Sequence, residues 1–174
     1  MEKKDIIRIA VVGPESTGKS VLCEQLALHY KTNYVPEFAR TYFEYNKIEK
    51  HRLFDIDFIY RMQIDLENEL IAKANTFLFC DTTLISGKVW AEEVFKTTPP
   101  FVADNLDKIK YDLYLLCDID LPWIKDKQRR NEHNRSKLFD DHKRELDRMN
   151  VPYKIIRGLK EARLENAVKA IEGI

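Results

Sequence analysis

The chain has 174 residues, of which 44% are hydrophobic and 33% charged, a composition typical of a soluble globular protein with one domain. Its 29 basic residues balance its 29 acidic residues, so a general attraction to nucleic acid or to acidic membranes is not expected. No apolar stretch approaches the roughly 20 residues of a membrane span, and three widely spaced cysteines, Cys23, Cys80 and Cys117, favour buried, reduced thiols in a cytoplasmic protein.

Strand-like and helix-like segments alternate along the chain. Short apolar runs at residues 6–12, 33–35, 76–80, 113–117 and 154–156 predict strands. The spacing of apolar residues between these runs predicts helices, the clearest being a stripe of Phe54, Phe58, Ile59, Met62, Leu66, Leu70 and Ala74. Two later helical patterns are Leu138, His142, Leu146, Met149 and Leu164, Ala167, Val168, Ile171. Alternating strands and helices predict an α/β fold of three layers, a parallel sheet with helices on both faces.

A phosphate-binding motif follows the first predicted strand. Residues 13–20 read Gly-Pro-Glu-Ser-Thr-Gly-Lys-Ser, which matches G-x-x-x-x-G-K-[ST]. We expect the nucleotide to be held by Gly13, Glu15, Ser16, Thr17, Gly18, Lys19, Ser20 and Val21. Lys19 is expected to reach the β- and γ-phosphates of ATP, and the Ser20 hydroxyl to sit on Mg²⁺. The strand before the motif and the helical pattern after it disfavour the alternative, a plain turn with a surface lysine.

Charged side chains follow the next three predicted strands. Ligands of parallel α/β sheets bind beyond the carboxyl ends of the strands, so these positions are candidates for chemistry. We expect Asp81 to organise the metal or act as a base, although it could be an ordinary helix N-cap. Glu37 and Arg40 are expected to contact substrate or phosphate, with a surface ion pair as the alternative. Asp118 either contacts substrate or simply ends its strand.

Basic residues are concentrated at 127–135, which read Lys-Gln-Arg-Arg-Asn-Glu-His-Asn-Arg. We predict a lid at about residues 124–136 that closes Arg129 and Arg135 over the phosphates. A solvated loop is the plain alternative. A nucleic-acid patch is disfavoured because the segment has no interleaved aromatic residues and the chain has no net positive charge.

The chain contains two tryptophans, Trp90 and Trp123. Either ring could stack on the flat base of a nucleoside, and packing in the core is the alternative for Trp90. The four histidines, at positions 29, 51, 133 and 142, lack the spacing of metal ligands and are assigned no chemistry.

Two common classes of P-loop protein do not fit this sequence. A GTPase needs N-K-x-D, but residues 46–49 read Asn-Lys-Ile-Glu and precede the strand that ends at Asp81. An AAA motor usually has Asp-Glu at its metal-binding strand, where this chain has Asp81 followed by Thr82. A small-molecule kinase remains, acting on a nucleoside-like substrate.

Five segments carry a resemblance to a known family. They are residues 13–20, 34–40 (Tyr-Val-Pro-Glu-Phe-Ala-Arg), 80–83 (Cys-Asp-Thr-Thr), 88–90 (Lys-Val-Trp) and 111–123, with Asp126 and Arg129 beyond. In this order they resemble the ribosylnicotinamide kinase domain of the bacterial bifunctional NAD-salvage regulators (NadR-like kinases) and its stand-alone relatives of AAA type. The resemblance covers nearly the whole chain, and only the phosphate loop is specific by itself.

The resemblance implies a P-loop kinase fold and ATP-dependent phosphorylation of the 5′-hydroxyl of nicotinamide riboside, giving nicotinamide mononucleotide. Lys19 and Ser20 would then hold phosphate and Mg²⁺, and Asp81 would orient or deprotonate the hydroxyl and help organise the metal. The acceptor side would be formed by Glu37, Arg40 and Trp90, and Arg129 would close with the lid.

Two departures from the family pattern concern the site. The familiar D-G-x-R is Asp-Lys-Gln-Arg at residues 126–129, and Gly87 stands where a bulkier or hydroxyl-bearing residue is expected. Neither an H-x-G-H nucleotidyltransferase signature nor a helix-turn-helix precedes the loop, so we expect the kinase reaction alone. Two alternatives stay open, a kinase for a different nucleoside or nucleotide and a regulatory P-loop ATPase. The sequence also leaves open the oligomeric state and whether Glu37 or Asp81 is the base.

Overall fold

The sheet of the protein is parallel throughout and has five strands. The structure, a computed structural model, describes residues 5–47, 51–125 and 132–174. The strands are β1 (Ile7–Val12), β2 (Tyr34–Val35), β3 (Phe77–Asp81), β4 (Leu113–Cys117) and β5 (Tyr153–Ile156). They are arranged in the order β2-β3-β1-β4-β5, and all four neighbouring pairs run parallel. The predicted strands are therefore confirmed, with shifts of one residue at several ends.

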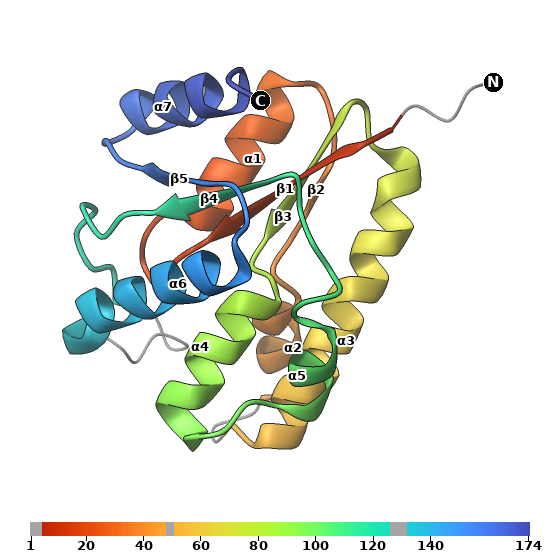
Figure 1. Cartoon of the computed structure of the whole chain (residues 1–174), viewed down its shortest axis with the longest axis vertical. Helices are drawn as coiled ribbons and strands as arrows, with labels where there is room; N and C mark the ends of the chain where they lie inside the picture. The colour runs from red at the N-terminus through yellow and green to blue at the C-terminus, as the bar shows by residue number, and fades with distance from the viewer. Residues whose placement is uncertain (1–4, 48–50, 126–131) are drawn as a thin grey trace.

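Helices cover both faces of the sheet (Figure 1). One face carries α1 (Lys19–His29) and α7 (Glu161–Ile171), and the other carries α2 (Phe38–Asn46), α3 (Leu53–Leu70), α4 (Leu84–Phe95), α5 (Pro100–Asn105) and α6 (Arg135–Met149). Short 3₁₀ turns lie at Ile71–Lys73 and Glu132–Asn134. Alternate residues of β1 enter opposite cores, Ile9 and Val11 beneath α1 and α7, Ala10 and Val12 beneath α3 and α4. This two-sided burial confirms the predicted three-layer α/β fold.

The long helix α3 buries a different face from the one its apolar pattern predicts. Phe54 is 73% exposed, whereas the buried positions include three polar residues, Asp55, Gln63 and Glu67. Each of these side chains is hydrogen-bonded, which removes the cost of its burial. The predicted stripe is wrong at its amino-terminal end because partners from other segments allow polar residues to face the core.

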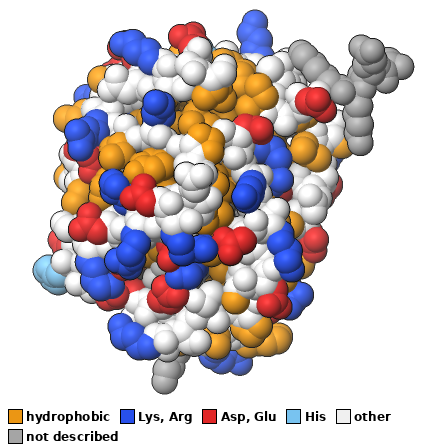
Figure 2. Space-filling view, viewed as in Figure 1, with side chains coloured by type: hydrophobic (Ala, Val, Ile, Leu, Met, Phe, Trp, Pro, Cys, Tyr) orange, Lys and Arg blue, Asp and Glu red, His pale blue; other side chains and the backbone are white. Residues whose placement is uncertain are grey.

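Ion pairs fasten α6 to α4 on the face shown in Figure 2, where basic and acidic side chains are interspersed. Lys88 of α4 contacts Glu145 of α6 at 2.8 Å, and Lys137 of α6 contacts Glu93 of α4 at 2.6 Å. The contact between Lys88 and Glu145 is mostly shielded from water, so solvent screens it less than an exposed pair. These contacts fix α6 against the helix that lines one side of the site described below.

No helix in the described part of the chain is long and apolar enough to cross a membrane. All three cysteines are buried, and the described structure pairs none of them in a disulfide. Burial raises the pKa of the Cys117 thiol to about 11, which leaves it protonated at neutral pH.

Candidate active site

The phosphate loop begins with a close approach between two strands. Gly13 has φ of +136°, and a Cβ at this position would lie 2.8 Å from the carbonyl oxygen of Cys117 at the end of β4. Glycine is therefore required both by the backbone conformation and by the space available. The chain can turn at once from the buried strand into the loop and return to start α1.

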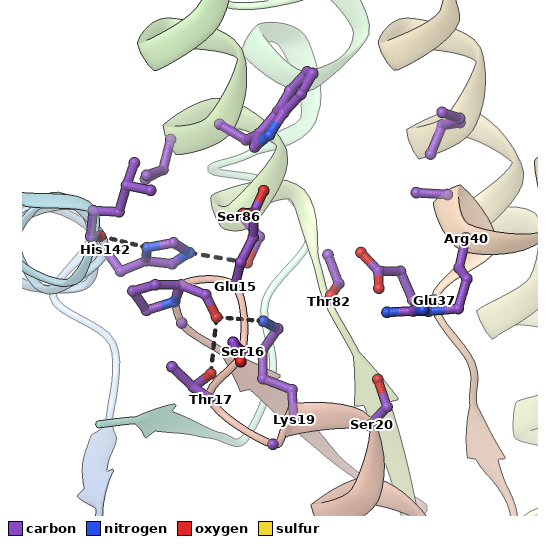
Figure 3. Close-up of a pocket in the computed structure, with 18 of the residues that line it drawn as sticks. Glu15, Ser16, Thr17, Lys19, Ser20, Glu37, Arg40, Thr82, Ser86 and His142 are labelled. Carbon is purple, nitrogen blue, oxygen red and sulfur yellow. Dashed lines mark hydrogen bonds between the residues drawn. The ribbon is translucent and has the colours of Figure 1, made fainter. Parts of the chain in front are cut away.

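Contacts within the loop close it into a concave shape (Figure 3). The Thr17 hydroxyl and the Lys19 ammonium both donate to the carbonyl oxygen of Pro14, at 2.8 and 2.7 Å. Among the described residues no side chain caps α1, whose N-cap is Gly18, so no side chain occupies the first N–H groups of the helix, and residues 18–20 line the cleft. Main-chain donors at a helix amino terminus, with an adjacent ammonium group, form a site suited to phosphate.

Arg163 of α7 supports the loop from behind. It is 4% exposed, and its guanidinium donates to the carbonyl oxygens of Thr17, Asp118 and Gly158, each at 2.9 Å, and to the carboxylate of Asp120 at 2.7 Å. One side chain thus ties the loop to the segments that follow β4 and β5. Sequence reasoning missed Arg163, because it lies far along the chain in an ordinary helical pattern.

Asp118, one of the predicted site residues, does not line the described cleft. The Asp118 carboxylate accepts hydrogen bonds from its neighbouring amide at 2.7 Å and from Arg157 at 2.6 Å. Arg129 lies outside the described residues, as do the other residues of the predicted lid between 126 and 131. Their roles in substrate binding and lid closure stay predictions.

Trp123 lies beside the phosphate loop and does not line the cleft. The Arg135 guanidinium carbon is 5.9 Å from the centre of the Trp123 ring. Arg135 also donates to the carbonyl oxygens of Ser16 and Leu121, at 3.1 and 3.0 Å. The first residue of α6 therefore contacts the loop backbone directly, on the side where Trp123 packs.

Two carboxyl groups lie near Lys19 at the floor of the cleft. Asp81 is 1% exposed, and its Oδ1 accepts a hydrogen bond from the Thr82 hydroxyl at 3.4 Å. Burial raises the pKa of Asp81, an effect that the charge of Lys19 and a hydrogen bond from Ser20 partly offset. Burial and the charge of Asp81 likewise raise the pKa of Glu37. The charge of Asp81 therefore acts on Glu37, as expected of two groups that lie in one site.

Asp81 has a buried oxygen suited to a metal ion. Its Oδ2 has no hydrogen-bond partner among the described residues, and the hydroxyl of Ser20 is adjacent. No group of three or more His, Cys, Asp or Glu side chains within the described ranges is arranged to hold a metal. Mg²⁺ commonly uses only one or two protein ligands and keeps several waters, so the predicted pair of Ser20 and Asp81 fits this ion.

Gln63 connects the segments that carry the two carboxylates. Its Oε1 accepts from the amide of Phe38 at 2.8 Å, and its Nε2 donates to the carbonyl oxygens of Pro36 at 3.3 Å and Asp81 at 3.5 Å. Within the described chain, the Glu37 side chain makes no capping hydrogen bond to α2, although Glu37 is its N-cap residue. Gln63 satisfies the first amide of this helix, and the Glu37 carboxylate is directed into the cleft (Figure 3).

Aromatic side chains form the far wall of the cleft. The ring centre of His51 lies 4.2 Å from that of Phe43 and 5.2 Å from that of Trp90. Tyr60 of α3 packs against Gly87 of α4, where a Cβ would lie 2.5 Å from the tyrosine ring. The unexpected glycine of the sequence therefore has a packing reason, since any larger residue would displace Tyr60.

Ser86 and His142 form a buried pair on another side of the cleft (Figure 3). His142 Nε2 is 3.1 Å from the Ser86 hydroxyl, and His142 Nδ1 is 2.7 Å from the carbonyl oxygen of Leu138. Burial lowers the pKa of His142 to about 4, so the ring is neutral at physiological pH. Sequence reasoning assigned this histidine only to the buried stripe of its helix.

The structure brings most of the predicted residues to one cleft. Those that line it are residues 13–21, Glu37, Arg40 and Trp90, while Asp81 is buried next to the lining residue Thr82. Residues that sequence reasoning missed also line it: Phe43, His51, Tyr60, Ser86 and His142. The site thus joins a phosphate loop, two carboxylates and an aromatic wall in one concave surface.

Comparison with known protein sequences shows both a family and a relative. The family described as AAA domain (AAA_28) matches residues 8–163. The chain is 27% identical over 132 residues to the trifunctional NAD biosynthesis/regulator protein NadR of Escherichia coli (strain K12). That alignment covers 68% of this chain and 30% of NadR, so the chain spans less than a third of the length of this curated relative.

Solved structures share the fold of the chain. Two structures of NadR, one in complex with NR and one with NAD and AMP-PNP, match with TM-scores of 0.80 and 0.81 at 22% identity, covering 97% of this chain and 51% and 49% of theirs. A deoxyadenosine kinase from M. mycoides matches with a TM-score of 0.68 at 11% identity, over 97% of this chain and 100% of that one. The expected kinase-like P-loop fold is therefore confirmed.

Proposed function

The chain belongs to the AAA domain family of P-loop proteins, and we propose that it is a kinase that transfers the γ-phosphate of ATP to the 5′-hydroxyl of nicotinamide riboside. The observation that carries this proposal is the single cleft in which the phosphate loop faces Glu37 and an aromatic wall. The similarity to NadR, one structure of which holds NR, supports the choice of acceptor.

The charges in the cleft favour a nucleoside over a nucleotide as acceptor. Lys19 and Arg40 are the Lys and Arg residues that line its described part, and Glu15 and Glu37 balance them. Lys19 serves the phosphates of ATP in this proposal, so little positive charge is left for an acceptor that already carries phosphate. A cationic pyridinium ring suits the carboxylates, and the face of Trp90 attracts a cation.

Phosphoryl transfer in this cleft depends mainly on positioning and charge. Lys19 would exchange its contact with the Pro14 carbonyl for the β- and γ-phosphate oxygens. Ser20 and Asp81 would hold Mg²⁺, which when bound neutralises phosphate charge. The 5′-oxygen forms its bond to phosphorus as the bond to the β–γ bridging oxygen breaks, and ADP leaves.

Glu37 is the better candidate for the base that receives the proton of the 5′-hydroxyl. It lines the cleft directly, whereas Asp81 is buried and its unpartnered oxygen suits the metal. The raised pKa of Glu37 also makes it a stronger proton acceptor than an ordinary glutamate. Replacement by Gln is expected to lower kcat about 100-fold and leave ATP affinity unchanged. Glu44→Gln, an exposed position on the same helix, is the matched control.

The direct test is incubation of the purified protein with Mg-ATP and nicotinamide riboside. We expect nicotinamide mononucleotide and ADP in equal amounts, measured by mass spectrometry and a coupled ADP assay. A panel of other nucleosides and monophosphates is run in parallel. Turnover of another acceptor, with nicotinamide riboside inert, would overturn the substrate assignment. ATP binding without turnover of any acceptor would instead favour a regulatory P-loop protein.

A further inference from the structure

We propose that Ser86, oriented by His142, recognises a ring hydroxyl of the acceptor's ribose and makes the enzyme prefer ribonucleosides to deoxynucleosides. This inference rests on the proposed kinase function and names a residue that determines its specificity. It is inferred from the direction of the two hydrogen bonds of His142, to Leu138 and from Ser86, and from the position of Ser86 in the cleft.

The backbone fixes which nitrogen of His142 carries the proton. The carbonyl oxygen of Leu138 can only accept, so His142 Nδ1, 2.7 Å away, must donate to it. A neutral imidazole then has an unprotonated Nε2, which can only accept. The Ser86 hydroxyl, 3.1 Å from Nε2, must therefore donate its single proton to His142. Ser86 offers only lone pairs to a ligand, so the ligand group that it binds must be a donor.

Two neighbouring side chains in the cleft likewise offer hydrogen-bond acceptors to a ligand. The Thr82 hydroxyl donates to Asp81 Oδ1 at 3.4 Å, which likewise leaves its lone pairs for a ligand. The ionised carboxylate of Glu37 can only accept. Ser86, Thr82 and Glu37 all line the cleft, and Figure 3 shows them around the space above Lys19. Sugar hydroxyls are donors and suit this surface, whereas phosphate oxygens do not.

The position of Ser86 selects the sugar as its partner. Ser86 and Trp90 are four residues apart on α4, so they lie on one face of this helix, with Ser86 one turn nearer to β3. A base stacked on Trp90 and a 5′-hydroxyl near the phosphate loop place the ribose between these two points, beside Ser86. A 2′- or 3′-hydroxyl of the ribose is then the donor that Ser86 binds.

The test compares each ribonucleoside with its 2′-deoxy and 3′-deoxy analogues in the kinase assay. The wild type is expected to show about tenfold higher kcat/KM for the ribonucleoside than for at least one analogue, mainly through KM. Ser86→Ala should remove this preference, and Ser86→Thr, which keeps a hydroxyl, should retain most of it. Ser136→Ala, at an exposed position of α6, is the matched control and should leave the preference unchanged.

A double-mutant cycle tests whether His142 acts through Ser86. His142→Phe should reduce the preference about threefold in the wild-type background and have no effect on it in the Ser86→Ala background. Thermal unfolding of each variant separates loss of specificity from loss of fold. An equal effect of His142→Phe in both backgrounds would contradict the proposed relay.

The outcomes separate this inference from the proposed substrate. Equal rates of the wild type with ribose and both deoxyribose forms would overturn the role of Ser86, even if nicotinamide riboside reacts. A ribose preference that depends on Ser86, found with another nucleoside while nicotinamide riboside is inert, would support the inference and overturn the substrate. Failure to phosphorylate any nucleoside of the panel would overturn both.

Discussion

The two ends of the cleft are built by different means. The phosphate end consists of one continuous segment, residues 13–20, whose donors are mainly backbone N–H groups, and Arg163 supports it from behind. The acceptor end is assembled from side chains of α2, α3, α4 and α6, which are held in place by hydrogen bonds between side chains and backbone, such as those of Gln63 and His142.

This difference predicts how each end responds to substitution. Backbone donors do not change with the side chain, so binding of triphosphate depends on few residues of the loop, Lys19 above all. Side chains set the geometry of the acceptor end, so single substitutions there can change specificity or turnover and leave nucleotide affinity intact. Substitutions of Lys19, Asp81, Arg163 and Gln63 test this division between the two ends.

Lys19→Ala removes the charged side chain of the phosphate end. We expect kcat/KM to fall about a thousandfold, because the charge developing on the transferred phosphate loses its ammonium partner. The fold should persist, since the lysine is partly exposed and its contact with Pro14 is local. A coupled ADP assay and thermal unfolding measure the two effects. Lys169→Ala, at an exposed position of α7, is the control, and a loss of less than tenfold for Lys19→Ala would contradict its role.

Asp81→Asn removes the charge of the buried carboxylate that lies between the phosphate end and the acceptor end of the cleft. Activity should fall about 100-fold as the metal loses a charged ligand, yet the melting temperature should rise. Folding raises the pKa of Asp81 above its ordinary value of 3.8, so the ionised carboxylate costs stability once the pH exceeds that value. The stability gained by the variant should be present at pH 7.5 and fade as the pH falls toward 4.

Asp104→Asn, an exposed position on α5, is the control for this stability measurement. A variant of Asp81 that melts below the wild type at pH 7.5, with the control unchanged, would contradict the raised pKa as a source of instability.

Arg163→Lys tests the support behind the phosphate loop. A lysine ammonium lacks the planar, forked donors of a guanidinium and cannot bind all four acceptors of Arg163. The phosphate loop should therefore lose its fixed position. We expect KM for ATP to rise about tenfold and the melting temperature to fall, with the preference among acceptors unchanged. Steady-state kinetics with varied ATP measure this. A change in acceptor preference with a normal KM for ATP would contradict the claim that the two ends of the cleft respond separately to substitution.

Gln63→Leu tests the acceptor end at nearly constant side-chain size. The link between the Glu37 segment and Asp81 would be lost, and we expect kcat to fall about fivefold with KM for ATP unchanged. Gln25→Leu on α1 makes the same substitution away from the cleft. Equal losses in both variants would indicate a general effect of the substitution on the protein and not a role for Gln63 in positioning.

Sequence alone predicted the parts of this protein that local pattern determines. The phosphate loop, its flanking strand and helix, and the position of Asp81 at the end of β3 follow from contiguous residues. The roles of Gln63 and of the Ser86–His142 pair could not be predicted, because their partners lie on other elements and are chosen by packing. The same cause explains Asp118, a plausible site residue by its place after β4, whose carboxylate instead binds Arg157 beyond β5.

The central claim is that one cleft holds ATP and a nucleoside and passes the γ-phosphate directly between them. Incubation with ATP labelled in its γ-phosphate and nicotinamide riboside measures this most directly. We expect the label to appear in the 5′-phosphate of nicotinamide mononucleotide, with one labelled product formed for each ADP released. Recovery of the label only as inorganic phosphate, or its retention in ATP, would contradict it.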